Sequence, residues 1–205
     1  MKKLSILFIL IFTPFVLSAQ DGAPGPGELC MAFYQNFLYK EAHENCQAGA
    51  KAGDSWSYVV LGNMYGRGLG VDKDLTKSAE FYKKAADKKN TTGMFNLATA
   101  YVNGDGVKQN SKTAIKLYKK AAKGGNYEGY YMIGKIYDEG KGVKQDLKKA
   151  LEYYTMAAEK ENYNGAAALT RHYSQSNELS DMDKVWFWGN KARNIKLKEN
   201  GVAAE

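Results

Sequence analysis

Apolar and polar positions along the chain repeat every 36 residues. Two columns of this repeat are Tyr65, Tyr101, Tyr137 and Tyr173, and Leu61, Leu97, Ile133 and Leu169. Within one unit, Leu61, Gly62 and Tyr65 stand at i, i+1 and i+4, which is one face of a helix. A second apolar stripe follows, with the alanine pairs Ala85-Ala86, Ala121-Ala122 and Ala157-Ala158. Each unit is therefore predicted to form two amphipathic helices, which bury their apolar faces only when neighbouring hairpins stack.

The connection between the two predicted helices carries a glycine pair and then a valine. The pairs are Gly68/Gly70, Gly104/Gly106 and Gly140/Gly142, followed by Val71, Val107 and Val143. The residue between the glycines changes from Leu69 to Asp105 to Lys141, whereas a phosphate site would need constant chemistry there. We therefore interpret the glycines as turn residues that need a positive φ or a close backbone approach. The second helix of each unit is expected to begin after a capping side chain, at Asp74, Asn110 and Asp146.

Residues 1–19 have the layout of a secretory signal peptide. Lys2 and Lys3 precede an apolar run from Leu4 to Leu17, and small residues follow. The run is shorter than the ~20 apolar residues that span a bilayer, so a transmembrane anchor is the weaker alternative. Gln20 stands where a lipoprotein would need cysteine. We expect a periplasmic or secreted protein with no integral membrane segment after cleavage.

The next segment is expected to hold a flexible leader, residues 20–28, and a divergent N-terminal hairpin, residues 29–53, with a tight turn around Asn36 to Tyr39. Cys30 and Cys46 are the only two cysteines and would lie on the two helices of this hairpin. Export to an oxidising compartment favours a disulfide between them. Two buried free thiols are the alternative.

The succession L-G-x-x-Y, G-x-G-V and A-x-x-Y-Y-x-x-A-A resembles the Sel-one-like repeat (SLR) family, relatives of tetratricopeptide repeats. The resemblance covers about residues 54–195, and the three units that match closely are 54–89, 90–125 and 126–161. It implies an all-α, right-handed α-solenoid of stacked helix-turn-helix repeats, about five hairpins in total. Residues 162–198 lack the glycine pair and are expected to form a degenerate C-terminal capping repeat, followed by a tail, residues 199–205.

Composition and candidate chemistry add little to this picture. The formal net charge is +7, but the lysines stand near carboxylates in helical patterns, which is typical of solvated helix faces. We expect no nucleic-acid partner. His43 and His172 lie in distant units, so neither a metal site nor a catalytic triad is predicted, and no cofactor. Some members of the family are described as β-lactamases, but no serine here is followed three residues later by lysine. We expect no enzymatic activity.

A partner surface is predicted from the family geometry, in which the first helix of each unit lines a concave groove. Two columns would face it: Val59, Phe95, Tyr131 and Ala167, and Asn63, Thr99, Lys135 and Arg171. An aromatic pair beside two cations suits an acidic and apolar segment of another protein. The alternative is that Phe95 and Tyr131 only pack between adjacent first helices. In the last helix, Trp186 and Trp188 fall in buried columns, whereas Phe187 falls in a polar column and would either seal the cap or mark a docking end.

These observations favour an exported repeat scaffold that mediates protein–protein interaction through its concave groove. The resemblance to the SLR family also implies a narrower alternative, a periplasmic immunity or inhibitor protein against a secreted bacterial toxin. An envelope hydrolase or β-lactamase-like enzyme is the third possibility, and no residue can be named that would perform its chemistry.

Overall fold

The computed structural model describes residues 24–176 and 181–201, and this part of the chain contains ten helices and no strand. The predicted signal peptide, residues 1–19, lies outside the described residues. The helices are α2 (Pro26–Gln35), α3 (Tyr39–Lys51), α4 (Ser55–Arg67), α5 (Leu75–Asp87), α6 (Thr91–Asn103), α7 (Ser111–Lys123), α8 (Glu128–Glu139), α9 (Leu147–Glu159), α10 (Tyr163–Ser174) and α11 (Met182–Glu199). They form five consecutive hairpins, which confirms the predicted all-α solenoid of stacked hairpins.

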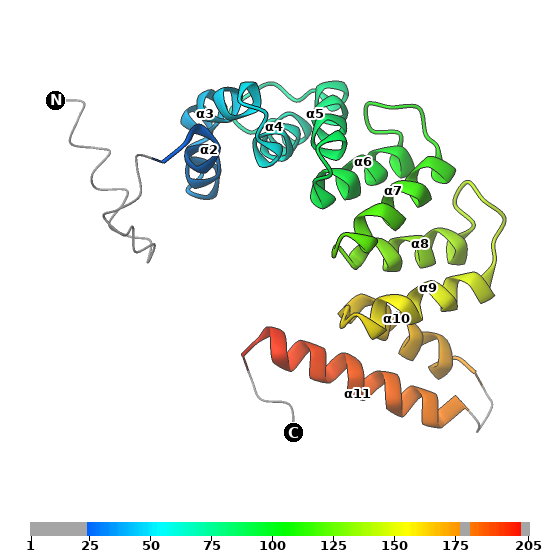
Figure 1. Ribbon diagram of the computed structural model, residues 1–205. Helices are drawn as coiled ribbons and strands as arrows, with labels where there is room; N and C mark the ends of the chain where they lie inside the picture. The colour runs from blue at the N-terminus through cyan, green and yellow to red at the C-terminus, as the bar shows by residue number, and fades with distance from the viewer. Residues whose placement is uncertain (1–23, 177–180, 202–205) are drawn as a thin grey trace.

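The hairpins follow one another along a curved path, with α2 at one end and α11 at the other (Figure 1). The second helix of each hairpin packs against the first helix of the next, through the pairs α3–α4, α5–α6, α7–α8 and α9–α10. The loops between α6 and α7 and between α8 and α9 lie on the outer side of the curve (Figure 1). None of the helices within the described ranges combines the length and the apolar character needed to cross a membrane.

The core is built from the columns that the repeat predicts. Leu61, Leu97, Ile133 and Leu169 are all buried. The alanine pairs lie between helices, where Ala85, Ala121 and Ala157 are completely inaccessible to solvent. Small side chains at these positions let neighbouring helices approach closely, and the larger tyrosines and leucines fill the remaining space.

The glycine loops have the backbone geometry that the sequence predicts. The first glycine of each pair ends a helix in the left-handed conformation, with φ of 71° at Gly68, 82° at Gly104 and 66° at Gly140. The second glycine lies against the start of the second helix of the preceding hairpin. A Cβ on Gly106 would overlap the carbonyl of Leu75 and would lie 2.6 Å from the Thr76 nitrogen. Both a positive φ and a close backbone approach are therefore required, and the loops are structural.

The predicted caps are present. Asp74, Asn110 and Asp146 each accept a hydrogen bond from the backbone nitrogen three residues later, at 2.9, 3.0 and 3.0 Å. The backbone nitrogens of the same three residues donate to Tyr65, Tyr101 and Tyr137 in the preceding helix. Each glycine loop is thus closed by one long-range backbone bond and ends in a capped helix.

At the N-terminal end, α2 begins at Pro26, inside the segment expected to be a flexible leader. Proline suits the first turn of a helix because its missing N–H would have no intrahelical partner there. The Glu28 carboxylate accepts a hydrogen bond from the Gly25 nitrogen at 3.2 Å and so also supports this start. The turn into α3 is short, as predicted, and contains Phe37 at a φ of 61°. Cys30 and Cys46 form a disulfide that joins α2 to α3, which confirms the predicted pairing.

Candidate protein-binding surface

The residues predicted to face a partner lie on the first helices α4, α6, α8 and α10, but one of them has no free surface. Val59 is only 3% exposed and belongs to the core, so its assignment to the groove is wrong. Its side chain is shorter than the rings at the equivalent positions, Phe95 and Tyr131, which are only half-buried. Ala167, also predicted, offers a partner only a methyl group. We use the name first-helix wall for the other six predicted residues: Asn63, Phe95, Thr99, Tyr131, Lys135 and Arg171.

The two aromatic residues of the first-helix wall pack against tyrosines of the second helix in their own hairpin. Phe95 meets Tyr118 edge to face, with ring centroids 5.1 Å apart, and Tyr131 lies 5.7 Å from Tyr154. Each ring is therefore held by the second helix of its own hairpin and does not pack only between adjacent first helices. Each ring keeps an accessible part, so it can contribute apolar area to a partner at little cost in side-chain entropy.

The polar residues of the wall fall into two groups. Asn63 and Thr99 are half-buried and bonded to tyrosine hydroxyls of the second helices: Asn63 accepts from Tyr82 and Thr99 is bonded to Tyr118, both at 2.8 Å. Asn63 also accepts from Asn96 of the next hairpin at 3.5 Å. These bonds hold both side chains in place. The two side chains therefore contribute to the shape of the wall and offer few free hydrogen-bonding groups to a partner.

Lys135 and Arg171 are the exposed cations of the wall. In the hairpin that contains Lys135 the tyrosine hydroxyl has a different acceptor, since Tyr154 donates to Asp138 at 3.1 Å. Lys135 forms only a surface ion pair with Glu139, at 3.6 Å, in which both side chains are about half exposed. Such pairs are worth little and exchange readily for a partner's carboxylate. The wall therefore becomes more basic toward the C-terminal end.

Burial of these tyrosines holds their hydroxyl groups in the protonated state. Loss of solvation raises the pKa of Tyr118 to about 12, partly offset by its hydrogen bond to Thr99. Loss of solvation also raises the pKa of Tyr82 and of Tyr154, and in Tyr154 the neighbouring Asp138 carboxylate raises it further. At neutral pH the three hydroxyls are therefore donors and acceptors that connect the two helices of a hairpin.

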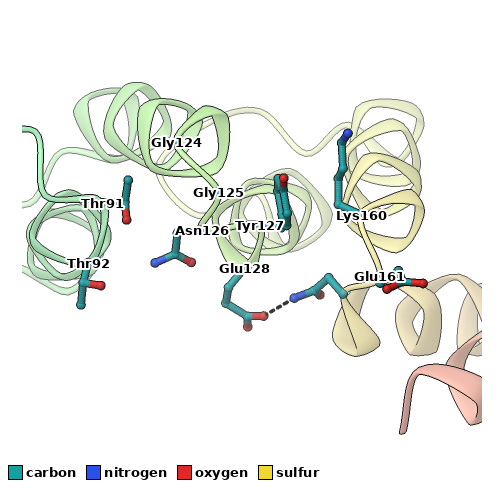
Figure 2. A pocket seen from close by; sticks show the side chains of 10 residues that line it. Thr91, Thr92, Gly124, Gly125, Asn126, Tyr127, Glu128, Lys160 and Glu161 are labelled. Atoms are coloured by element: carbon teal, nitrogen blue, oxygen red, sulfur yellow. Dashed lines mark hydrogen bonds between the residues drawn. The ribbon is translucent and has the colours of Figure 1, made fainter. Parts of the chain in front are cut away.

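A polar cleft that the sequence reasoning missed lies beside the start of α6 and the next two turns that connect one hairpin to the following one (Figure 2). Its volume is about 500 Å³, and it is lined by the start of α6, the turn from α7 to α8 and the turn from α9 to α10. The Glu128 carboxylate accepts from the side-chain amides of Asn162 and Asn164, at 2.7 and 3.0 Å. The Lys160 ammonium lies 5.8 Å from the centroid of the Tyr127 ring. Both oxygens of the Glu128 carboxylate therefore already accept hydrogen bonds within the protein.

The signal for this cleft is a column of asparagines at Asn90, Asn126 and Asn162. The side chains of Asn90 and Asn162 cap α6 and α10 by accepting from Gly93 and Gly165. In the middle unit the Gly129 nitrogen instead donates to the backbone carbonyl of Asn126, at 3.0 Å. The side chain of Asn126 therefore does not cap its helix. The sequence does not reveal this difference, because all three units have asparagine at this position.

The last helix differs from its prediction at one aromatic residue. Trp188 packs on the core beside α10, as expected, but Trp186 is 72% exposed and not buried. In the inner hairpins the next hairpin covers the equivalent position, whereas within the described residues α11 packs mainly on α10. Phe187 is 52% exposed and meets Trp188 edge to face, with centroids 4.8 Å apart.

The described residues also show where the two histidines lie. His43 is within hydrogen-bonding distance of Tyr65 and Gln47, and His172 packs against Tyr173 in the last hairpin. Within residues 24–176 and 181–201 no three His, Cys, Asp or Glu side chains are grouped so that they could hold a metal ion.

Comparison with known proteins identifies the repeat. The family model of the Sel1 repeat matches residues 57–90, 91–126 and 128–162, which together are just over half of the chain. A component of the ERAD-associated E3 ubiquitin-protein ligase of Arabidopsis thaliana is 35% identical over 77 residues, which is 36% of this chain and 13% of that protein. A Sel1-like repeat-containing protein of Acanthamoeba polyphaga mimivirus is 39% identical over 51 residues, 25% of this chain and 9% of that protein. The chain thus spans about a tenth of the length of these curated relatives.

Two solved structures share the fold over most of the chain. A Sel1 repeat protein from Oxalobacter formigenes is 28% identical with a TM-score of 0.72, covering 82% of this chain and 73% of its own. A protective antigen with an SLR fold, from uropathogenic Escherichia coli strains, is also 28% identical, with a TM-score of 0.69 over 82% of this chain and 38% of its own. Both likenesses extend beyond the three matched repeats to the flanking hairpins.

Proposed function

Because this chain belongs to the Sel1 repeat family, we propose that it is a non-catalytic scaffold that holds another protein against the first-helix wall. Proteins built from Sel1 repeats generally act by binding other proteins. The invariant side chains of the repeat are used to stack one hairpin on the next. The residues that vary along the first helices are therefore the ones available to a partner.

The observation that carries the proposal is the combination of anchored rings and exposed cations on α6, α8 and α10. Phe95 and Tyr131 are held by Tyr118 and Tyr154, so they present apolar area without having to be ordered on binding. Lys135 and Arg171 lie exposed on the neighbouring first-helix column. A partner segment that alternates apolar and acidic residues would satisfy both groups.

The proposed scaffold acts outside the cytoplasm. The disulfide between Cys30 and Cys46 supports this location, because such bonds persist in oxidising compartments. The signal-peptide layout of residues 1–19 supports it independently. Neutralisation of a bacterial toxin in the periplasm would be a narrower version of the same role, and the identity of the bound protein decides between the two.

The test begins with affinity capture of the mature chain from its own cell envelope, followed by mass spectrometry. The dissociation constant of the captured partner is then measured for Lys135→Glu combined with Arg171→Glu. Both side chains are exposed, so this variant should fold normally and bind about tenfold or more weakly, since each reversal turns attraction into repulsion. It is a sharper test than Phe95→Ala with Tyr131→Ala, because those changes also remove packing on Tyr118 and Tyr154.

The matched control is Lys83→Glu combined with Lys119→Glu. These lysines are exposed on the second helices α5 and α7, and the variant changes the net charge by the same amount. It should bind like the wild type. If both double variants weaken binding equally, the partner senses net charge alone and the first-helix wall is not the site.

A further inference from the structure

The last described hairpin exposes a side chain at a position that is covered in the inner hairpins. Ala79, Ile115, Leu151 and Trp186 stand in one column of the repeat, the last at a spacing of 35 because α11 is shifted by one residue. Ile115 packs in a core cluster that includes Ile133 of the next hairpin, and Leu151 packs in a cluster that includes Leu169. Trp186, the largest side chain of the column, is 72% exposed. A polar residue would be expected at the free end of a stack.

Trp186 is part of a wider apolar strip on α11. Met182 is 65% exposed one helical turn before it, and Phe187 is 52% exposed beside it. A hollow of about 390 Å³ runs along the helix between these rings and is lined further on by Asn190, Asn194 and Lys198. Amide side chains next to two aromatic rings suit a protein surface, which offers both apolar area and hydrogen-bonding groups. We call Met182, Trp186, Phe187, Asn190 and Asn194 the α11 strip.

Charge indicates what kind of partner fits the α11 strip. The helix carries five basic residues, Lys184, Lys191, Arg193, Lys196 and Lys198, against the acidic residues Asp183 and Glu199. Three of them form ion pairs: Lys184 with Asp181 at 2.6 Å, Lys196 with Glu199 at 3.1 Å, and Lys198 with Glu161 of the preceding turn at 2.6 Å. Lys191 and Arg193 take part in none of these pairs. The surroundings of the strip remain basic, so acidic residues on a partner would be attracted.

The same charges argue against a second copy of this chain. Two α11 helices packed in the same direction would bring their basic C-terminal halves together. A head-to-tail contact on the face of α2 is also poorly matched, because the side chains that α2 exposes between its ends are Glu28 and Ala32. The large exposed apolar group at this end, Phe37, lies in the turn after α2 and not on the helix.

We propose that the α11 strip binds an acidic amphipathic helix of a partner protein, lying where the first helix of a sixth hairpin would lie. This site is separate from the first-helix wall. The chain could therefore hold one protein along the wall and a second at its C-terminal end.

The test uses a pair of synthetic 18-residue amphipathic helices as probes. Each has a leucine stripe, flanked by glutamate in one peptide and by lysine in the other. Binding to the mature chain is measured by fluorescence anisotropy of the labelled peptide. The acidic peptide should bind at least about tenfold more tightly than its lysine twin. Trp186→Ala combined with Phe187→Ala should remove most of this binding.

The control variant is Trp56→Ala combined with Phe37→Ala, which removes the same two side-chain types at exposed positions near the other end of the solenoid. It should bind the acidic peptide like the wild type, and circular dichroism should show that both variants are folded. Arg193→Glu combined with Lys191→Glu should reverse the preference between the two peptides.

Three results would overturn the proposal. The first is equal or absent binding of both peptides. The second is a dimer in sedimentation analysis that Trp186→Ala dissolves, which would identify a second copy as the occupant. The third is Trp186-dependent binding to phosphatidylglycerol vesicles without binding of the acidic peptide, which would identify a lipid surface. None of these bears on the first-helix wall, whose variants change only Lys135 and Arg171.

Discussion

Three tyrosines of the second helices connect the two helices of each inner hairpin. Their hydroxyl groups reach Asn63, Thr99 and Asp138 of the first helices, at 2.8, 2.8 and 3.1 Å. Tyr118 is completely buried, and each of these hydroxyls has a partner. A buried hydroxyl is tolerated because it is bonded, and it then fixes the register of one helix on the other.

The raised pKa of Tyr118 makes stability depend on alkaline pH. An unfolded tyrosine ionises near pH 10, whereas burial raises the folded pKa to about 12. The folded state therefore keeps the proton longer. Its contribution to the free energy of unfolding is complete below pH 10 and is lost as the pH rises from 10 to 12.

Tyr118→Phe removes this titration. Between pH 9.5 and 12 the free energy of unfolding of the wild type should fall by roughly 2 kcal/mol more than that of the variant, from a shift of about two units. Urea titrations followed by circular dichroism at a series of pH values measure the difference. Tyr127→Phe removes an exposed hydroxyl and should leave the wild-type pH dependence in place. If the free energy of unfolding fell with pH in the same way for the wild type and Tyr118→Phe, burial would not raise the pKa of Tyr118.

Among the elements, the glycine loop decides how closely one hairpin lies on the previous one. Gly104 and Gly106 both have a positive φ, of 82° and 69°. A Cβ on Gly104 would meet no atom closer than 3.6 Å, whereas a Cβ on Gly106 would overlap the backbone of Leu75. The first glycine is thus required for conformation alone, and the second for conformation and contact between hairpins.

Alanine substitution separates these two requirements. Gly104→Ala should lower the free energy of unfolding by about 1–2 kcal/mol, the cost of a left-handed L-residue. Gly106→Ala should cost roughly 2 kcal/mol more, because the added carbon must displace the start of α5. Urea unfolding of both variants measures the difference. Equal losses for the two variants would mean that the hairpins can separate slightly without cost.

The elements also show what the sequence can predict. The inner hairpins, their caps and their glycine turns follow from local rules that repeat every 36 residues, so each unit confirms the others. The start of α2 at Pro26 was missed because proline and glycine in a leader also suit a flexible segment. The burial of Val59 and the exposure of Trp186 were missed for a different reason. Residues in one column of the repeat share the same burial only when their side chains are of similar size and each is followed by a similar hairpin.

The candidate site was predictable only in part. The first helices were identified correctly as carriers of Phe95, Tyr131, Lys135 and Arg171, because the repeat assigns the other side chains to the core. The polar cleft around Glu128 depends on contacts across three connections, and a single-chain pattern does not show such contacts.

At the scale of the whole molecule, a stack of hairpins has two ends and a long side, and its chemistry differs among them. At the N-terminal end a disulfide cross-links α2 and α3. At the other end of the described residues, α11 exposes Trp186 and Phe187. The first-helix wall runs between them and becomes more basic toward α10. Because each hairpin contacts mainly its neighbours, a change on the wall should not disturb the strip on α11.

Covalent labelling of lysines measures whether a bound partner covers the first-helix wall. The chain is treated with an amine-acetylating reagent, alone and in complex with its captured partner, and labelling rates are measured by mass spectrometry. Lys135 on the wall should be protected several-fold in the complex, while Lys83 and Lys119 on the second helices should react at unchanged rates. Unchanged labelling of Lys135 together with protection of Lys83 or Lys119 would show that the partner binds elsewhere and would contradict the account.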